Sequence, residues 1–285
     1  MSSIVTDHAQ WLARRRQGIG GSDVAGIFGL SDYATPYSIW ANKMGLAPEK
    51  DDTPNMRLGR DLENYVAQRF SEQTGLKVRR DGRTITNPDY PYSFAHIDRR
   101  IVGRSMGLEC KTVSPYRSSE FSETEYPIEY YTQALHYLGV TGWDVWYIAV
   151  LILDGTFLVY EIKREDVQEE IDEVQRRVAE FWEDHVLANQ PPPVDGKKAT
   201  KDALNSVFSN TVDACINLDH LERQAIEIHA LNDKINALEF QQELYRQEIK
   251  AAMGNHEMAE IGAWKASWRP NKKGTRVFKI NIRRD

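Results

Sequence analysis

The sequence predicts an α/β (or α+β) fold in which helices flank a mixed central β-sheet, because strand-like and helix-like stretches alternate along it. Two apolar runs, residues 94–102 and 106–113, are separated by a turn-like Gly-Arg-Ser and should form an antiparallel hairpin. Two further strand-like runs, residues 144–152 and 156–162, are joined by Asp-Gly, a strong hairpin signal.

Helices are predicted where apolar residues recur near the helical period or where proline and glycine mark the ends. These stretches are 8–17, 36–43, 55–74, 127–140 and 164–187. The helix at 55–74 should end at Gly75, and Pro127 suits the first turn of its helix. A strand-like segment at 77–86 precedes the central hairpin.

The C-terminal part of the sequence predicts a separate appendage. Residues 189–199, NQPPPVDGKKA, form a predicted linker, because three consecutive prolines are stiff and cannot continue a helix. We therefore expect a core at 1–188 and an appendage at 200–285. Residues 215–253 lack Pro and Gly and predict one long helix with heptad positions Leu221, Ile228, Ile235, Gln242 and Ile249, and Leu231, Leu238, Tyr245 and Ala252.

Such a helix needs a partner. At 1.5 Å per residue its span would be ~58 Å, too long to be buried along its whole length in a small domain. The partner helix would come from another copy of the chain, from another protein or from the core. After Gly254, residues 257–261, 264–269 and 275–282 predict a small antiparallel sheet with a basic turn.

Composition limits the class of protein. The chain has 285 residues, a formal net charge of −6 and two cysteines, which argues against a disulfide framework. Its start lacks the apolar region of a signal peptide, and no stretch approaches the ~20 apolar residues that cross a bilayer. We expect a cytoplasmic protein with no membrane contact. Basic clusters at 14–16, 77–83 and 272–276 keep nucleic-acid binding open despite the acidic total.

The stretch 96–111, HIDRRIVGRSMGLECK, carries the candidate catalytic residues. Side chains alternate along a strand, so Glu109 and Lys111 should point to one face and Cys110 to the other. If Asp98 on the partner strand faces the same way, two carboxylates and the backbone carbonyl of Cys110 form an oxygen cage that Mg²⁺ or Mn²⁺ prefers. Lys111 would then hold or polarise an attacking water.

This spacing also occurs in hairpins whose solvated face carries an exposed ion pair worth ~0–1 kcal/mol. The apolar residues around Ile97 and Leu108 favour the metal site, because buried charges are rarely kept without a partner or a metal. Glu63, at the edge of the apolar stripe of its helix, points either toward the hairpin or to solvent. His96 is interpreted as structural or as a partner of a metal ligand, with direct metal ligation as the alternative, and Asp89, in a turn-like context, receives no role.

A second candidate site lies near the start of the chain. In GIGGSD at 18–23, Ser22 stands where an N-cap should, and the preceding glycines leave backbone N–H groups accessible to an anion such as phosphate. Arg15, just upstream, would complement phosphate oxygens. The alternative is a plain capped helix after a tight turn.

Together these stretches resemble the YqaJ-type phage recombination exonucleases, relatives of lambda exonuclease in the RecB-like, restriction-endonuclease-like nuclease superfamily. The matching motifs, in order within residues 10–185, are Arg15 with GIGGSD at 18–23, RLGRDLE at 57–63, AHID at 95–98, GLECK at 107–111, and Gln133 with Tyr137. The resemblance implies a restriction-endonuclease-like core. The segment 200–285 has no counterpart in the minimal fold, so its purpose is open.

The resemblance also implies metal ligands. Asp98, Glu109 and the Cys110 carbonyl would ligate two Mg²⁺ ions, for which Mn²⁺ would substitute, and Lys111 would assist the nucleophilic water. Glu63 would be a second-metal or water-mediated ligand.

DNA contacts follow from the same resemblance. Gln133 and Tyr137 would lie beside the active site and touch the DNA backbone, while Arg15 and Ser22 would grip a 5′-phosphate. The implied activity is 5′-to-3′ resection of one strand of linear duplex DNA, which leaves a 3′ overhang for a single-strand annealing protein. Implied partners are double-stranded DNA ends, further copies in a ring-like trimer and that annealing protein. The alternatives are a non-hydrolytic DNA-end-binding scaffold and a RecB-type nuclease of different polarity or endonucleolytic mode.

Overall fold

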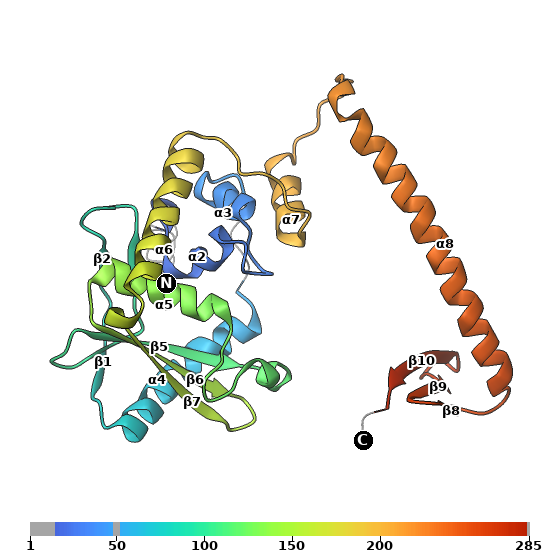
Figure 1. The fold of residues 1–285 in the computed structure, drawn as a ribbon, viewed down its shortest axis with the longest axis horizontal. Coiled ribbons are helices and arrows are strands. Elements are labelled where there is room, and N and C mark those ends of the chain that lie inside the picture. Colours follow the sequence, from blue (N-terminus) through green and yellow to red (C-terminus); the bar gives the residue numbers. More distant parts are fainter. Residues whose placement is uncertain (1–14, 48–51, 284–285) are drawn as a thin grey trace, which may run out of the picture. The chain divides into compact units, whose positions relative to one another are not determined.

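The computed structural model describes residues 15–47 and 52–283, and the chain divides into two units, Met1–Thr211 and Val212–Asp285 (Figure 1). The helix expected at 8–17 therefore lies largely outside the described residues, as does Arg14. Among the described residues, no helix combines the length and the apolar character needed to cross a membrane.

A five-stranded mixed sheet forms the centre of the first unit (Figure 1). Its strands, in spatial order, are β1 (Val78–Arg80), β4 (Arg99–Ile101), β5 (Met106–Val113), β6 (Val145–Ile152) and β7 (Phe157–Lys163). Neighbouring strands are antiparallel except β5 and β6, which run parallel. Both expected hairpins are therefore confirmed, and the parallel pair requires a long crossover, which contains α5 (Ile128–Thr141).

The first apolar run of the central hairpin is not one continuous strand. It contains β3 (Phe94–His96) and β4, and β3 pairs with β2 (Thr84–Thr86) in a separate two-stranded sheet. The chain thus changes sheets at Ile97 and Asp98.

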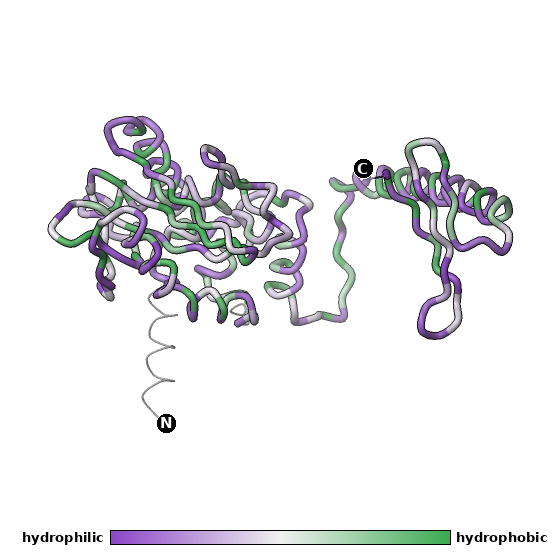
Figure 2. The backbone as a smooth tube through the Cα atoms, turned by 90° about the horizontal axis from the view of Figure 1, so that it is seen from below, coloured by the Kyte–Doolittle hydropathy of each residue, from purple (hydrophilic) through white to green (hydrophobic). Residues whose placement is uncertain are grey.

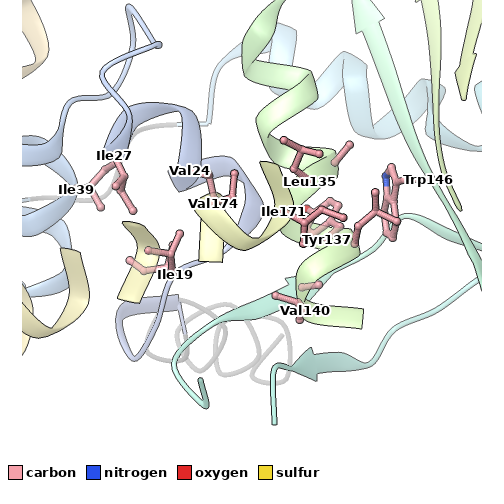
Figure 3. Packing of buried hydrophobic residues seen from close by; sticks show 14 of the residues in the cluster. Ile19, Val24, Ile27, Ile39, Leu135, Tyr137, Val140, Trp146, Ile171 and Val174 are labelled. Atoms are coloured by element: carbon pink, nitrogen blue, oxygen red, sulfur yellow. The ribbon is translucent and has the colours of Figure 1, made fainter. Parts of the chain in front are cut away.

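Helices cover both faces of the central sheet. On one face lie α2 (Gly21–Ile27), α5 and α6 (Gln168–Phe181), and Figure 3 shows Val24, Leu135 and Val174 from these helices packed in one cluster. On the other face, α4 (Pro54–Thr74) packs Val66 and Phe70 against alternate residues of β5 and β6. Figure 2 shows hydrophobic stretches concentrated in the centre of this unit. The predicted fold class is confirmed.

Several predicted helix boundaries hold and others shift. The helices α3 (Pro36–Lys43) and α4 match the prediction, and α4 ends at Gly75 with φ 72°. The last helix of the core is composite: a 3₁₀ turn (Arg164–Asp166), then α6, then a π-helix (Trp182–Leu187). A short 3₁₀ helix (Pro115–Glu120) follows β5.

The boundary between the units falls later than the prolines suggest. The last two residues of the expected linker already belong to α7 (Lys198–Val207), whose Thr200 and Ala203 are buried in the first unit. The hydroxyls of Thr200 and Thr35 are 2.7 Å apart and share a hydrogen bond. The triple proline is thus a rigid connection within the first unit, and the units separate at 211–212.

The second unit contains the long helix and the small sheet (Figure 1). The helix α8 (Glu222–Met253) follows a 3₁₀ turn (Asp219–Leu221), so the helix expected at 215–253 begins seven residues late. The strands β8 (Met258–Ile261), β9 (Trp264–Pro270) and β10 (Arg276–Ile282) form the expected antiparallel sheet.

Candidate active site

Asp98 occupies the break between β3 and β4. Its Oδ2 accepts a 2.8 Å hydrogen bond from the backbone N–H of Cys110 on β5. The regular pairing of β4 with β5 ends beside this point, at Arg99 opposite Leu108. The carboxylate thus bonds to a backbone group of β5 where the strand pairing has ended, which fixes Asp98 beside Glu109.

Glu109 and Lys111 point to the face covered by α5, as strand alternation predicts. Lys111 Nζ donates to Glu109 Oε1 over 2.8 Å and to Gln133 Oε1 over 2.8 Å. The amide of Gln133 also donates through Nε2 to Glu109 Oε1 over 2.7 Å and to the hydroxyl of Tyr137 over 2.9 Å. Cys110, in contrast, packs on the α4 face.

The charges of this cluster shift its proton affinities. Burial and the nearby charge of Glu109 raise the pKa of the Asp98 carboxyl to about 8. Burial alone would lower the pKa of Lys111, but Glu109 and Asp98 outweigh it and raise the pKa above its usual value. Lys111 is therefore protonated at neutral pH, whereas Asp98 holds a proton unless further positive charge arrives.

The donor set fits a divalent cation. Glu109 Oε2 is buried and has no hydrogen-bond partner within the described part of the chain, and Asp98 would be ionised by an added positive charge. Two carboxylates close enough to repel each other favour a hard cation such as Mg²⁺. Across residues 15–47 and 52–283, however, no three His, Cys, Asp or Glu side chains are grouped so that they could hold a metal ion.

Glu63 is the expected ligand that does not join this cluster. Its Oε1 accepts hydrogen bonds from Arg99 Nη1 and from Arg80 Nη2, the second over 3.2 Å. Arg99, which is buried, also donates to Asn64 Oδ1 and to the carbonyl of Asp98. Of the two orientations considered for Glu63, toward the hairpin or to solvent, the structure shows the first. Its charge is neutralised there by Arg99 and Arg80 and is not left available to a metal.

The glycine-rich turn brings the second candidate site to the first. A Cβ at Gly21 would lie 2.6 Å from the Tyr137 ring and 3.0 Å from Gln133 Cγ, so only glycine allows α2 to approach α5 this closely. One residue later, Ser22 Oγ accepts a 3.1 Å hydrogen bond from Arg15 Nη2. Gly21, the neighbour of Ser22 in the predicted phosphate site, therefore lies directly against Gln133 and Tyr137.

The helix that carries Ser22 starts earlier than predicted. Helix α2 begins at Gly21 with Gly20 at the cap, so Ser22 is not the N-cap. The backbone N–H of Gly20 is instead bound by Asp23 Oδ2 over 3.1 Å. Burial alone would raise the pKa of Asp23, but Lys43, at 2.6 Å, and Arg15, at 3.7 Å, hold it below its usual value.

The structure gives the contacts of His96 and Asp89. His96 Nε2 and Thr84 Oγ1 are 2.9 Å apart and join β3 to β2. Asp89 follows Asn87, whose Oδ1 accepts from the backbone N–H of Asp89 over 2.9 Å.

Comparison with known proteins identifies the family. A family model of YqaJ-like viral recombinase domains matches residues 10–144. The uncharacterized protein YqaJ of Bacillus subtilis (strain 168) is 37% identical over 266 residues, which cover 92% of this chain and 83% of that protein. The chain belongs to the YqaJ-like family of viral recombinase domains.

Solved structures show which fold this YqaJ-like chain shares. An alkaline exonuclease (LHK-Exo) from Laribacter hongkongensis matches with a TM-score of 0.51 at 18% identity, over 64% of this chain and 94% of that one. The same enzyme in complex with dAMP matches with a TM-score of 0.51 at 19% identity and the same coverage. The fold expected for a relative of lambda exonuclease is thereby confirmed.

Two residues of this YqaJ-like site were missed by sequence reasoning. Tyr130, one turn before Gln133 on α5, places its ring 5.0 Å from Lys111 Nζ. Lys43, from α3, binds Asp23 and the carbonyl of Arg15. The spacing of Tyr130 and Gln133, three residues apart on one helix, was a usable signal, whereas nothing local in the sequence marks Lys43.

Proposed function

We propose that this protein is a metal-dependent exonuclease that resects one strand of linear duplex DNA from 5′ to 3′, prefers a 5′-phosphate and leaves 3′ single-stranded overhangs for recombination by annealing. The observation that carries the proposal is the bonding of Gln133 to both Glu109 and Lys111, beside Asp98. The family and the exonuclease fold agree with this activity.

Asp98 and Glu109 would hold the metal, together with the Cys110 carbonyl and with Glu63 as a further, water-mediated ligand. Two Mg²⁺ ions, or Mn²⁺ in their place, would lower the pKa of an attacking water and offset charge on the phosphoryl oxygens. For Glu63 to take part, its bonds to Arg99 and Arg80 would have to loosen when DNA and metal bind.

Lys111 acts as a donor rather than as a base. Its raised pKa keeps the ammonium group protonated, and two of its three N–H bonds point to Glu109 and Gln133. The third can donate to the attacking water or to a phosphoryl oxygen, where a preformed positive charge stabilises the developing negative charge. Gln133 fixes the direction of that donor.

Arg15 and Ser22 would bind the 5′-phosphate, and Tyr137, whose hydroxyl accepts from Gln133, would contact the backbone next to it. Arg15 already points at Ser22 and Asp23, so a phosphate would compete with Asp23 for a positioned guanidinium. A phosphate held here would set the position of the terminal phosphodiester relative to Glu109 and Lys111.

The partners we propose are a DNA end, further copies of the chain and a single-strand annealing protein. The helix α8 carries exposed apolar residues in heptad spacing, among them Ile228, Leu231, Ile235 and Leu238. A second copy is the occupant that this pattern fits, because Ile at position a with Leu at position d favours two strands in a parallel coiled coil. A ring-like trimer is the assembly implied by the resemblance to lambda exonuclease.

The test uses linear duplex DNA labelled at the 5′ or the 3′ end. We expect Mg²⁺- or Mn²⁺-dependent release of the 5′ label first, faster with a 5′-phosphate, and no cutting of closed circles. Lys111→Ala should abolish cleavage and leave DNA binding in chelator largely intact, whereas Lys163→Ala, at an exposed position of β7, should cleave normally.

Each competing function predicts a different result. A scaffold would bind ends without shortening them, with or without chelator. A nuclease of the other polarity would release the 3′ label first, and an endonuclease would cut circles.

A further inference from the structure

The small sheet of the second unit is strongly basic in a chain that is acidic as a whole. Residues 254–283 contain seven Lys and Arg against two Asp and Glu, whereas the full chain has a net charge of −6. Two strands of this sheet, β9 and β10, pair over seven residues each and are joined by the turn Asn271–Gly274, where Asn271 Oδ1 binds the N–H of Lys273 over 2.9 Å. We call this hairpin, residues 264–282, the basic ribbon.

The two faces of the basic ribbon differ in character. One face carries Trp268 and Phe278, and it is partly covered by cations: Arg276 lies 3.7 Å from the Trp268 ring centre and Lys250 of α8 lies 5.6 Å from that of Phe278. Ala266, on the same face, is fully buried. This face therefore packs in part within the unit, although Trp264, Ile280 and Ile282 on it are exposed. None of the strand side chains on the opposite face is buried.

The solvent face carries the positive charge. Alternation along the strands places Lys265, Arg269 and Lys279 on it, and Lys272 and Lys273 stand at the tip. Arg269 is paired with Glu257 over 3.4 Å. In the described residues, Lys265, Lys272, Lys273 and Lys279 are exposed and have no ion pair.

Four unpaired ammonium groups on one ribbon form a local positive surface that attracts a polyanion. The charged face has no aromatic ring, so it lacks the stacking platform on which single-stranded bases are bound. A two-stranded ribbon is also narrow enough to lie along or in the major groove of B-DNA, which is roughly 12 Å wide. These features together select the phosphates of duplex DNA.

We propose that the basic ribbon is a second DNA-binding element, which belongs to a different unit of the chain from the candidate active site and binds the phosphate backbone of duplex DNA. The inference deepens the proposed function, on which it rests for the identity of the polyanion. The chain as a whole is acidic and would repel DNA, so a locally basic surface such as the basic ribbon is needed to attract DNA over long range. Contacts to phosphates alone carry no sequence preference.

The test compares two triple variants of the full chain. The ribbon variant is Lys265→Ala with Lys272→Ala and Lys279→Ala, and the control is Lys163→Ala with Lys198→Ala and Lys201→Ala, which removes three exposed charges from the first unit. Binding of a fluorescently labelled blunt duplex is measured by anisotropy in EDTA over a range of salt concentrations. Circular dichroism confirms that both variants fold.

We expect the ribbon variant to bind about tenfold more weakly at low salt, and its plot of log affinity against log salt to be less steep by about 1 to 3. The control should bind within about twofold of the unmodified protein. The inference is overturned if the ribbon variant binds the duplex as tightly as the unmodified protein, or if the control variant loses as much affinity as the ribbon variant. It is also overturned if polyglutamate displaces the duplex from the unmodified protein as well as unlabelled duplex does. A loss confined to single-stranded DNA overturns it too.

Cleavage in Mg²⁺ is measured in parallel, so that the two proposals fail separately. If the unmodified protein does not cleave but the ribbon variant loses binding, the nuclease assignment fails and the ribbon assignment stands. If the unmodified protein cleaves and the ribbon variant binds DNA as tightly as it does, the ribbon assignment fails and the nuclease assignment stands.

Discussion

Gln133 Nε2 donates a 2.7 Å hydrogen bond to Glu109 Oε1, which links the helix that crosses over the sheet to the strand that carries the acidic residue. The same amide accepts from Lys111, so one side chain sets the relative position of a carboxylate and an ammonium group. Because Gln133 also bonds to Tyr137, the network extends to the contact with Gly21. The predictions below test this network and the structures that support it.

Gln133→Leu should lower kcat for duplex cleavage by about 10- to 100-fold, because it keeps the bulk of the side chain but removes the bonds that orient Glu109 and Lys111. Gln133→Glu should do at least as much damage, since it sets a second carboxylate against Glu109. Single-turnover cleavage of labelled duplex measures the effect. Activity within twofold of normal in both variants would show that Gln133 has no positioning role.

Gly21→Ala should reduce the free energy of unfolding by about 1–3 kcal/mol, because its methyl group would enter the space of the Tyr137 ring. The matched control is Gly59→Ala within α4, where no atom lies within 4 Å of the added carbon. Gly59→Ala should stabilise the protein by up to about 1 kcal/mol, since alanine favours a helix. Urea denaturation measures the free energy of unfolding of both variants. If Gly21→Ala and Gly59→Ala change it equally, the close contact of Gly21 with the Tyr137 ring is contradicted.

The geometry of the catalytic strand was predictable because strand alternation is a local property. Glu109 and Lys111 fall on one face whatever else the chain does, and the glycine-containing turn sets their partner strand. The hydrogen bond that Asp98 accepts at the break between the two sheets was harder to predict from the sequence, because it depends on β3 pairing with β2 in a separate sheet.

The side-chain contacts that could not be predicted join residues far apart in the sequence. Glu63 meets Arg99 across 36 residues, and Lys43 meets Asp23 from another helix, so neither partner can be read from a neighbouring motif. The late start of α8 has a local cause: Asn217 Oδ1 accepts a 2.9 Å hydrogen bond from the backbone N–H of Asp219, and such a side-chain bond to the backbone competes with helical hydrogen bonding at this point.

Tyr130→Leu should lower kcat while Tyr130→Phe leaves it nearly unchanged, because the aromatic face, not the hydroxyl, lies against Lys111. A cation over a ring is worth roughly 0.5–2 kcal/mol, so the expected loss in Tyr130→Leu is between about twofold and thirtyfold. Steady-state kinetics of both variants provide the measurement. A loss of equal size in Tyr130→Phe would assign the effect to the hydroxyl instead.

In chelator, the free energy of unfolding should fall between about pH 4 and pH 8 through Asp98. The folded pKa of about 8 exceeds the ordinary value of 3.8, so the folded state binds the extra proton, and its stabilising effect is complete at low pH and is lost as pH rises through 8. Asp98→Asn should flatten this fall by on the order of 1–3 kcal/mol. Urea denaturation at pH 5 and pH 8.5 measures it, and parallel curves for the two proteins would refute the shift.

The pair Ile235→Lys and Leu238→Lys should dissociate the proposed oligomer, because it places charges at the a and d positions of the exposed heptad on α8. In a parallel pair, Lys234 would also face Glu239 of the second helix, an attraction consistent with self-association.

The control pair, Asn236→Lys with Gln247→Lys, adds the same charge to α8 outside the heptad core and should leave the assembly intact. Size-exclusion chromatography with light scattering gives the mass of each protein. A monomeric unmodified protein, or equal dissociation of the control pair, would exclude α8 as a self-association surface. The mass of the intact assembly also decides between the trimer implied by resemblance and the pair of helices favoured by Ile at a with Leu at d.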